Sequence, residues 1–467
     1  MRAIFLAAAA GVTFFSLATP AAANGRFPAS NQIVFSPTDA NLVVLRTSYG
    51  VLPSHDHGAS WSYICEDALG LGPMAFEDPS IGLTQHNSLI AGVSVGLDVS
   101  SDVGCNWNCI GGGLAGQAIA DIAIRPDAPT RAVALTRTYL PTDSALDSIS
   151  SQVFETTDEG ATWSPMGVPI DPAVTVATID VAKTDPNRIY VSGTRNFGTA
   201  KTASLFVSTD KGATWTEEVL PSAQFDPSME DSIYIGTVDP TDADRVYIRS
   251  EGILTGGESR LTVFTRAPDA TVQFKTAYLF DVGAQMGLTG ELLGFALSED
   301  GSKIYVGSQE SGLWVGTAAD LTFHKTSSIV VQCLATHGTE LWACSAAVSG
   351  FVAGVSTDDG ATFTAKLPLV GALTGPIACP ANPQGAACGT TTNSSQCVAA
   401  YATFCINEIC GPADAGATSP PAKASSSSCA VAVVGGGGAT VFGVLVAMAG
   451  LSLRRTRRDR STRRSVQ

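Results

Sequence analysis

Basic residues are scarce in this chain. Among its 467 residues there are 27 Lys and Arg, 42 Asp and Glu, and five His. Without the first 23 residues and the Arg-rich C-terminus, the remainder holds 19 basic and 41 acidic residues, a net charge of about −22. Proteins bind nucleic acids and anionic membranes through Lys and Arg. The composition therefore argues against both partners and favours neutral or cationic ones.

The usual sequence signatures of cofactor and nucleophile sites are also missing. No glycine-rich phosphate loop stands between a predicted strand and a helix, and no Gly-x-Ser-x-Gly motif occurs. His55 and His57 flank Asp56 in SHDHGASW, and a His-x-His pair on a turn can bind a metal. Both, however, occupy variable positions of a repeated motif. We therefore predict no metal site and no cofactor.

The repeated motif is the main signal in the sequence. Five stretches fit Ser/Thr-x-Asp-x-Gly-x-x-aromatic, at residues 54–61, 100–107, 156–163, 208–215 and 356–363. Eroded copies start near Thr265 and Gly316. The seven starting points are on average about 50 residues apart, and a period of that size is typical of repeat architectures.

The residues before each motif also repeat. An alternating apolar strand leads to a turn rich in Pro, Asp, Gly or Asn, then to a second strand (LVVLRT, RIYVSG, KIYVGS), and then to a third that enters the motif (SLFVS, GLWVG). The residues after the motif, such as WTEEVL, form a fourth strand. Four strands in each of seven repeats predict an all-β fold, a seven-bladed β-propeller over residues 24–375.

Each motif has a structural role in this interpretation, because it lies between the third and fourth strands. Its Ser/Thr and Asp side chains bond to main-chain N–H groups of the turn, its Gly adopts a positive φ, and its aromatic residue packs into the blade. The residues concerned are Ser54, Asp56, Gly58, Trp61, Ser100, Asp102, Gly104, Trp107, Thr156, Asp158, Gly160, Trp163, Ser208, Asp210, Gly212, Trp215, Ser356, Asp358, Gly360 and Phe363.

The motif resembles the Asp-box, also called the bacterial neuraminidase repeat (BNR). This repeat occurs in sialidases, xyloglucan-active hydrolases, sortilin-type receptors and plastid photosystem II assembly factors. The resemblance covers residues 30–370 and implies a sialidase-like propeller fold. It does not imply a particular function, because the box lies away from the central face where such proteins bind ligands.

The chain departs from the sialidase pattern where catalysis would be expected. Sialidases use three Arg to bind a carboxylate, a Tyr–Glu pair and an acidic Asp, and the first Arg usually lies in Phe/Tyr-Arg-Ile-Pro. The matching region here reads NGRFPAS, with the aromatic residue after Arg26. Other glycosidases need two carboxylates. Acidic pairs occur at Glu66-Asp67, Glu77-Asp78 and Glu230-Asp231, and we interpret them as solvated loop residues, so the catalytic residues are unknown.

Both ends of the chain resemble targeting segments. Residues 1–23 combine Arg2, an apolar stretch and three Ala, as in a secretory signal peptide. Residues 430–453 carry no charge, and this stretch is long enough to form a transmembrane helix. The Arg cluster that follows it predicts that the preceding chain lies outside the cell. The order of a tether (413–428), then Cys429, the apolar span and the Arg cluster (429–467) resembles the C-terminal sorting domain of myxobacterial surface proteins. That resemblance implies processing near Cys429 and display on the cell surface.

Eleven Cys in an exported chain predict disulfides. If Gly338-Thr339 forms a two-residue turn, Cys333 and Cys344 lie opposite each other on a hairpin and can bridge. Five Cys fall in a Cys-rich segment over 376–412, and this odd number predicts at least one bridge back to the propeller. A zinc site is the alternative, although the segment has no His and no Cys-x₂-Cys spacing.

We expect an exported, cell-surface propeller that binds a glycan or a protein at its central face or loops, without catalysis. It would contact the membrane through its C-terminal helix before any processing. Two alternatives remain open: a secreted glycoside hydrolase of sialidase-like or xyloglucanase-like type, and an assembly factor like those of photosystem II. Paired carboxylates about 5–10 Å apart at the central face would favour the hydrolase.

Overall fold

The computed structural model describes residues 30–69, 78–140, 148–195, 201–221, 230–252, 259–280 and 292–379, together with Cys397 and Tyr401. They all belong to the first of two compact units, Met1–Ala413; the second unit is Asp414–Gln467. The predicted signal peptide, tether, Cys429 and apolar span lie outside the described residues, as does most of the predicted Cys-rich segment. Within the described ranges, no helix has the length and hydropathy needed to cross a membrane.

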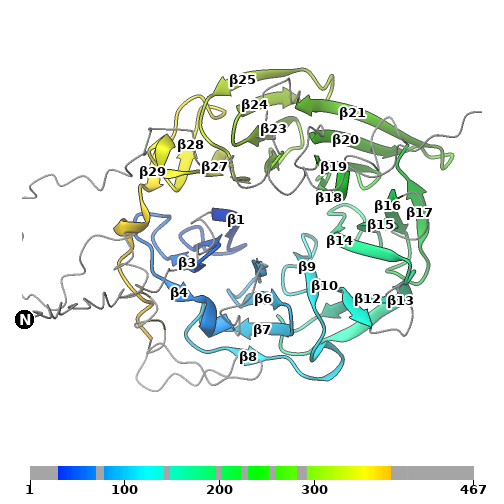
Figure 1. Cartoon of the computed structure of the whole chain (residues 1–467), viewed down its shortest axis with the longest axis horizontal. Coiled ribbons are helices and arrows are strands. Elements are labelled where there is room, and N and C mark those ends of the chain that lie inside the picture. The colour runs from blue at the N-terminus through cyan, green and yellow to red at the C-terminus, as the bar shows by residue number, and fades with distance from the viewer. Residues whose placement is uncertain are drawn as a thin grey trace, which may run out of the picture. The chain divides into compact units, whose positions relative to one another are not determined.

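The described strands form seven antiparallel sheets that follow one another around a ring, shown in Figure 1. Each sheet is a blade built from four consecutive strands, and blade 3 has one additional strand, β11 (Thr138–Leu140), paired with β12. The prediction of an all-β, seven-bladed β-propeller is confirmed.

The strands of the first four blades, from the centre of the ring outward, have the following bounds. Blade 1 contains β1 (Ser30–Phe35), β2 (Val43–Thr47), β3 (Gly50–Ser54) and β4 (Ile64–Cys65); blade 2 contains β5 (Ser80–Leu83), β6 (Leu89–Val93), β7 (Gly96–Ser100) and β8 (Asn108–Cys109); blade 3 contains β9 (Ile119–Ile124), β10 (Ala132–Thr136), β12 (Ser148–Thr156) and β13 (Ser164–Ile170); blade 4 contains β14 (Val174–Val181), β15 (Ile189–Arg195), β16 (Thr202–Ser208) and β17 (Thr216–Val219).

The remaining three blades follow the same plan. Blade 5 contains β18 (Glu230–Val238), β19 (Arg245–Gly252), β20 (Ser259–Arg266) and β21 (Val272–Phe280); blade 6 contains β22 (Gly294–Leu297), β23 (Lys303–Ser308), β24 (Gly312–Thr317) and β25 (Phe323–Ser327); blade 7 contains β26 (Cys333–His337), β27 (Glu340–Cys344), β28 (Ala353–Ser356) and β29 (Thr364–Leu367). The described residues also form four short 3₁₀ helices, between strands or after β29: η1 (Glu66–Leu69), η2 (Gly112–Leu114), η3 (Ala347–Ser349) and η4 (Val370–Ala372).

Burial follows the position of a strand within its blade. Among the second strands, β6 (LIAGV) and β10 (AVALT) are covered on both faces, since every one of their residues is buried. The fourth strands are more exposed, as in β17 (TEEV), which has no buried residue. A strand covered on both faces reads as a continuous apolar run, so the middle of each blade is enclosed by the blades on either side.

The repeated motifs occupy the turns between third and fourth strands. In each, the main-chain N–H of the Gly donates to the Ser or Thr hydroxyl four residues earlier, at 2.7–2.9 Å. One Asp oxygen accepts from the N–H four residues later, at 2.8–2.9 Å. The residue between Asp and Gly has a φ of 56–60° in all five copies. These bonds fix the tight turn that reverses the chain within each blade.

The aromatic residues of the motifs are buried to different degrees. Trp61 and Trp107 are buried, and each donates its indole N–H to the carbonyl of the motif Gly. Trp163 does the same while partly exposed, and Trp215 donates to the carbonyl of Val168 in blade 3 instead. Phe363 is partly exposed and stacks on Phe351, with ring centroids 5.3 Å apart.

The motif turns also hold each blade against the preceding one, which the sequence interpretation did not foresee. Asp359 of blade 7 accepts hydrogen bonds from Lys303 and Tyr305 of blade 6, at 2.7 Å for both closest contacts. Glu159 of blade 3 accepts from Thr84 of blade 2 at 3.1 Å. His57 of blade 1 lies 3.0 Å from a carboxylate oxygen of Glu340 in blade 7. In these three copies the residue with positive φ therefore contacts the preceding blade.

The two eroded copies also lie between third and fourth strands. In blade 5 the turn carries Ala270 with a φ of 66°, and the N–H of Thr271 donates to Asp269. In blade 6 Leu321 has a φ of 58°, and the N–H of Thr322 donates to Asp320. In all seven blades, therefore, the turn between the third and fourth strands is held by an Asp side chain. In two of the blades this turn lacks the motif Gly.

Three disulfides join described cysteines. Cys333 and Cys344 pair across β26 and β27, which are connected by Gly338 and Thr339. Cys65 pairs with Cys397, and Cys105 with Cys379. The sequence predicted at least one bridge from the C-terminal segment back to the propeller, and the described residues contain two.

We expect Gly360→Ala to destabilise the propeller more than Gly338→Ala. Both glycines have a positive φ, 82° and 59°. A Cβ at Gly360 would lie 2.1 Å from Leu313 Cδ2 of blade 6, whereas a Cβ at Gly338 would have no neighbour within 4 Å. The cost of holding Ala in the left-handed conformation, about 1–2 kcal/mol, is common to both variants, and overpacking adds roughly 1–3 kcal/mol for Gly360→Ala. Equal losses in the free energy of unfolding, measured in urea, would show that this blade contact tolerates a methyl group.

Candidate functional site

A cavity of about 370 Å³ is lined by residues of the seven blades, most of them in the innermost strands. Its lining comes from all seven blades: Asn31, Gln32, Ile33, Arg46, Asp78, Ser80, Ala120, Asp121, Ala177, Thr178, Tyr234, Ile235, Gly236, Arg249, Leu293, Phe295, Cys333 and Leu334. A cavity of several hundred Å³ with polar groups converging on it is the usual form of a ligand site.

The motif turns lie at the opposite end of the blades from this cavity. In blade 1, Phe35 pairs with Val43, and Val43 pairs with Ser54. Ser54 is therefore level with the end of β1, while the cavity is lined by Asn31 to Ile33 near its start. The same register holds in blade 3, where Ile124 and Thr156 both pair with Ala132. The twenty predicted motif residues thus play no direct part in the cavity.

Side chains near the ring centre join every blade to the next by hydrogen bonds to main-chain groups. In order around the ring these are Gln32 to Ile81 O at 3.1 Å, Ile122 N to Ser80 at 3.1 Å, Ile179 N to Asp121 at 3.0 Å, Ile235 N to Thr178 at 2.7 Å, Arg249 to Leu292 O at 3.0 Å, Thr336 to Leu297 O at 2.6 Å, and Ser30 N to Gln332 at 3.3 Å. Most of the polar side chains that line the cavity therefore also hold neighbouring blades together.

Asp121 is the carboxylate most deeply involved in these bonds. One of its oxygens accepts from Ser80 Oγ at 2.9 Å and from its neighbour Ile122 N–H at 2.9 Å; the other accepts from Ile179 N–H at 3.0 Å. The pKa of Asp121 is raised to about 6, chiefly because the carboxyl is removed from water; the three hydrogen bonds oppose this rise, and the nearby Asp180 adds to it. Burial likewise raises the pKa of Asp180.

Two arginines and one tyrosine provide the other large polar groups of the cavity. Arg46 donates to Pro79 O at 3.0 Å, at the start of blade 2. The guanidinium of Arg249 lies 4.9 Å from the ring centroid of Tyr234, a cation–π contact that holds the two side chains together. Asn31 donates to Asp78 at the rim of blade 2. The cavity therefore presents hydrogen-bond donors, an aromatic ring and charges of both signs.

The acidic pairs noted in the sequence are only partly included in the described residues. Glu66 and Asp67 lie in η1, beyond the outer strand of blade 1. Of the pair at 77–78, Asp78 lines the cavity and its neighbour lies outside the described residues. The pair at 230–231 begins the inner strand β18 of blade 5, and its side chains lie outside the described part.

The His-x-His pair does not form a metal site in the described residues. His55 is exposed, and His57 Nδ1 lies 2.9 Å from Ala40 O while its Nε2 faces Glu340. Among the residues that the structure describes, no three His, Cys, Asp or Glu side chains gather closely enough to bind a metal ion.

Sequence reasoning missed the residues that line the cavity. Arg46, Tyr234 and Arg249 stand in ordinary strands, and nothing local distinguishes them. The signal for Asp121 was its place in IADIAI, where a carboxylate interrupts an apolar strand. The same holds for Asp180 in VTVATIDV. A charged residue inside a buried strand requires a partner, and here the partner is the neighbouring blade.

Comparison with known proteins adds little about function. The family described as Sortilin, neurotensin receptor 3 matches residues 96–244, about a third of the chain. No curated protein matches the sequence. The assignment of the fold therefore rests on the described strands.

Solved structures that resemble the chain do so weakly. The GH74 xyloglucanase from Xanthomonas campestris is 15% identical, with a TM-score of 0.39 over 72% of this chain and 58% of its own. An ancestral GH74 enzyme is 11% identical, with a TM-score of 0.38 over 73% of this chain and 54% of its own. The structure of YCF48 bound to D1 peptide is 14% identical, with a TM-score of 0.39 over 62% of this chain and 81% of its own. The chain thus spans little more than half the length of the two GH74 proteins, and none of these likenesses carries an inference about activity.

We expect the stability difference between the natural chain and Asp121→Asn to depend on pH. Because the pKa of Asp121 is raised to about 6 in the folded state, the folded chain binds this proton more tightly than the unfolded chain does. The ionised form therefore costs stability above pH 6, and the cost disappears as the pH falls to about 4. Relative to Asp121→Asn, the natural chain should gain up to about 3 kcal/mol between pH 7 and pH 4.

The measurement is urea unfolding of both proteins across this pH range. Titrating groups that do not interact with Asp121 contribute equally to both proteins and cancel in the difference, in which the smaller interaction with Asp180 remains. The lost hydrogen bonds add an offset that does not vary with pH. A difference that stays flat, or that changes in the opposite direction, would contradict the raised pKa.

Proposed function

We propose that this chain is an exported, cell-surface binding module of the Asp-box propeller type, without catalytic activity, that holds part of a glycan or of a protein partner in its central cavity. The observation that carries the proposal is the cavity itself, which is lined by all seven blades and presents Arg46, Arg249 and Tyr234 together with main-chain groups. A rigid ring whose polar groups point into one cavity is suited to selective binding.

The charged groups of the cavity favour binding over hydrolysis. Among the described residues that line it, the carboxylates are Asp78 and Asp121. Both oxygens of Asp121 accept hydrogen bonds that join blades 2, 3 and 4. Glycosidases need two carboxylates placed on either side of the scissile bond, one to donate a proton and one to act as nucleophile or base. A carboxylate occupied by main-chain donors is poorly suited to either role.

Export is supported by the cysteines. The chain forms three disulfides between described residues, two of which join segments more than 270 positions apart. Such bonds persist in oxidising compartments and are rare in the cytosol of most organisms. This agrees with the signal peptide and surface-sorting tail that the sequence predicts.

The first experiment separates binding from hydrolysis. The protein, produced in an oxidising compartment, is incubated with a panel of soluble polysaccharides and sialosides, and released sugar is measured. Binding to the same panel and to an array of peptides is measured in parallel. We expect binding without release. Release of sugar from any substrate would contradict the proposal and support a glycoside hydrolase.

A matched pair of variants then tests the location of the site. Ala177→Trp places an indole in the cavity, because Ala177 is part of its lining. Ala319→Trp places the same group on an exposed turn of blade 6. We expect Ala177→Trp to weaken binding of the ligand found in the panel by at least about tenfold, a change of about 1.4 kcal/mol, and Ala319→Trp to leave it unchanged. Equal binding by both variants would place the site elsewhere.

A further inference from the structure

The two ends of the ring are not joined by a shared strand. Every blade consists of strands that are consecutive in the chain, so blade 1 begins with β1 and blade 7 ends with β29. The seam between blades 7 and 1 must therefore be closed by other contacts. Direct contacts include Ser30 Oγ donating to Val352 O at 3.2 Å, and His57 Nε2 lying 3.0 Å from a carboxylate oxygen of Glu340.

The chain after blade 7 crosses this seam and pairs with blade 1. Thr374 N–H donates to Trp61 O at 2.9 Å, Tyr63 N–H donates to Gly375 O at 2.8 Å, and Ile377 N–H donates to Tyr63 O at 2.9 Å. Pro376 and Tyr63 form a parallel bridge. We refer to Leu373–Cys379, with Cys397 and Tyr401, as the strap.

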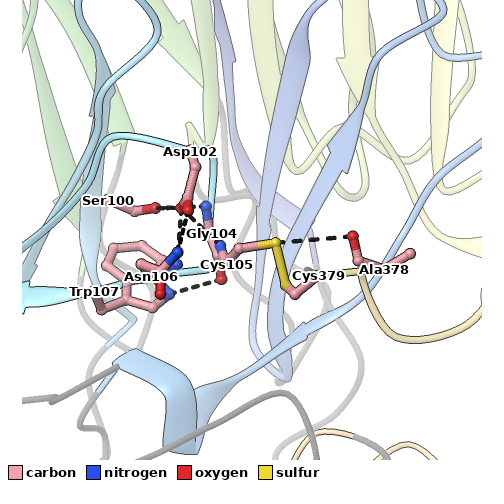
Figure 2. The surroundings of a disulfide bond; sticks show 8 residues. All are labelled: Ser100, Asp102, Gly104, Cys105, Asn106, Trp107, Ala378 and Cys379. Carbon is pink, nitrogen blue, oxygen red and sulfur yellow. Dashed lines mark hydrogen bonds between the residues drawn. A yellow bond between two sulfur atoms is a disulfide. The ribbon is translucent and has the colours of Figure 1, made fainter. Parts of the chain in front are cut away.

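Two disulfides lock the strap to the start of the propeller. Cys397 bonds to Cys65 at the end of β4 in blade 1. Cys379 bonds to Cys105 in the motif turn of blade 2, next to the hydrogen bonds of Asp102 to the Cys105 and Asn106 N–H groups, as Figure 2 shows. The strap is thus attached covalently to two successive blades at the far end of the chain from blade 7.

One continuous hydrophobic cluster connects the same parts. It contains Trp61 and Ile64 of blade 1, Trp107 of blade 2, Trp342 of blade 7, and Leu373 of the strap. Tyr401 packs against Tyr63, with ring centroids 5.7 Å apart, and donates to Leu373 O. The strap therefore covers apolar surface that blades 1 and 2 would otherwise expose.

We infer that the strap is the closure of the ring and that its two disulfides make this closure redox-sensitive. The bonds span 332 and 274 positions of sequence, almost the whole propeller, whereas the bond between Cys333 and Cys344 spans 11 within one hairpin. Closing a long loop removes more freedom from the unfolded chain than closing a short one. Reduction by a dithiol converts each S–S bond to two thiols and oxidises the dithiol to its own disulfide. Blade 1 is then held to blade 7 by non-covalent contacts alone.

The test is hydrogen–deuterium exchange of the full chain, oxidised and then reduced with dithiothreitol under native conditions. We expect amides of β1–β3 and β26–β28, on the two sides of the seam, to exchange at least about tenfold faster after reduction, while β14–β16 on the opposite side of the ring stay within about twofold. Local opening with an intact remainder is the signature of a separate cooperative unit.

Variants assign the effect to the strap. The double variant Cys65→Ser with Cys397→Ser, and the matched pair Cys105→Ser with Cys379→Ser, should reproduce faster exchange at the seam without reductant. The control, Cys333→Ser with Cys344→Ser, removes a disulfide inside blade 7 and should affect β26–β28 but not β1–β3. If a strap variant fails to fold, reduction of the natural chain still gives the result. Exchange that rises equally in all seven blades, or that stays unchanged at β1–β3, would overturn the inference.

Discussion

The structure depends on one constraint: each blade is apolar on both faces, and both faces must be covered. Strands such as β6 and β10 are buried along their whole length, so a blade left at an open end would expose its core to water at a cost of about 25 cal/mol for each Å² of apolar surface. A ring in which every blade has two neighbours satisfies this constraint. Seven sheets in sequence order form that ring.

The polar groups of the blades serve the same packing. Near the centre, side chains such as Asp121 and Thr178 satisfy main-chain donors of the next blade. At the opposite end, the motif turns reach the preceding blade through Glu159 and Asp359. Because buried main-chain groups are costly to leave unpaired, these bonds set the register of each blade against the next. The raised pKa of Asp121 is the electrostatic cost of placing a carboxylate at this junction.

The central cavity is a consequence of the ring. Seven inner strands cannot meet at one point, so their residues surround a space, and the side chains that line it are in contact both with this space and with the neighbouring blades. Arg249 illustrates both roles, since it bonds to Leu292 O and also lies over Tyr234 at the cavity wall. A site built from groups that already hold the scaffold in place is preorganised, which is consistent with the proposed binding role.

The sequence by itself determined the features that depend on neighbours along the chain. Strand alternation, the period of about 50 residues and the seven turns were enough to predict the number of blades, and the hairpin around Gly338 and Thr339 placed Cys333 opposite Cys344. These features are local because a turn and its hydrogen bonds involve only a few consecutive residues. The tertiary structure decided which distant residues meet: the cavity set of Arg46, Asp121 and Tyr234, and the pairing of Cys65 with Cys397. Those contacts arise only when the ring closes, and its closure depends on the packing of whole blades, which no short stretch of sequence records.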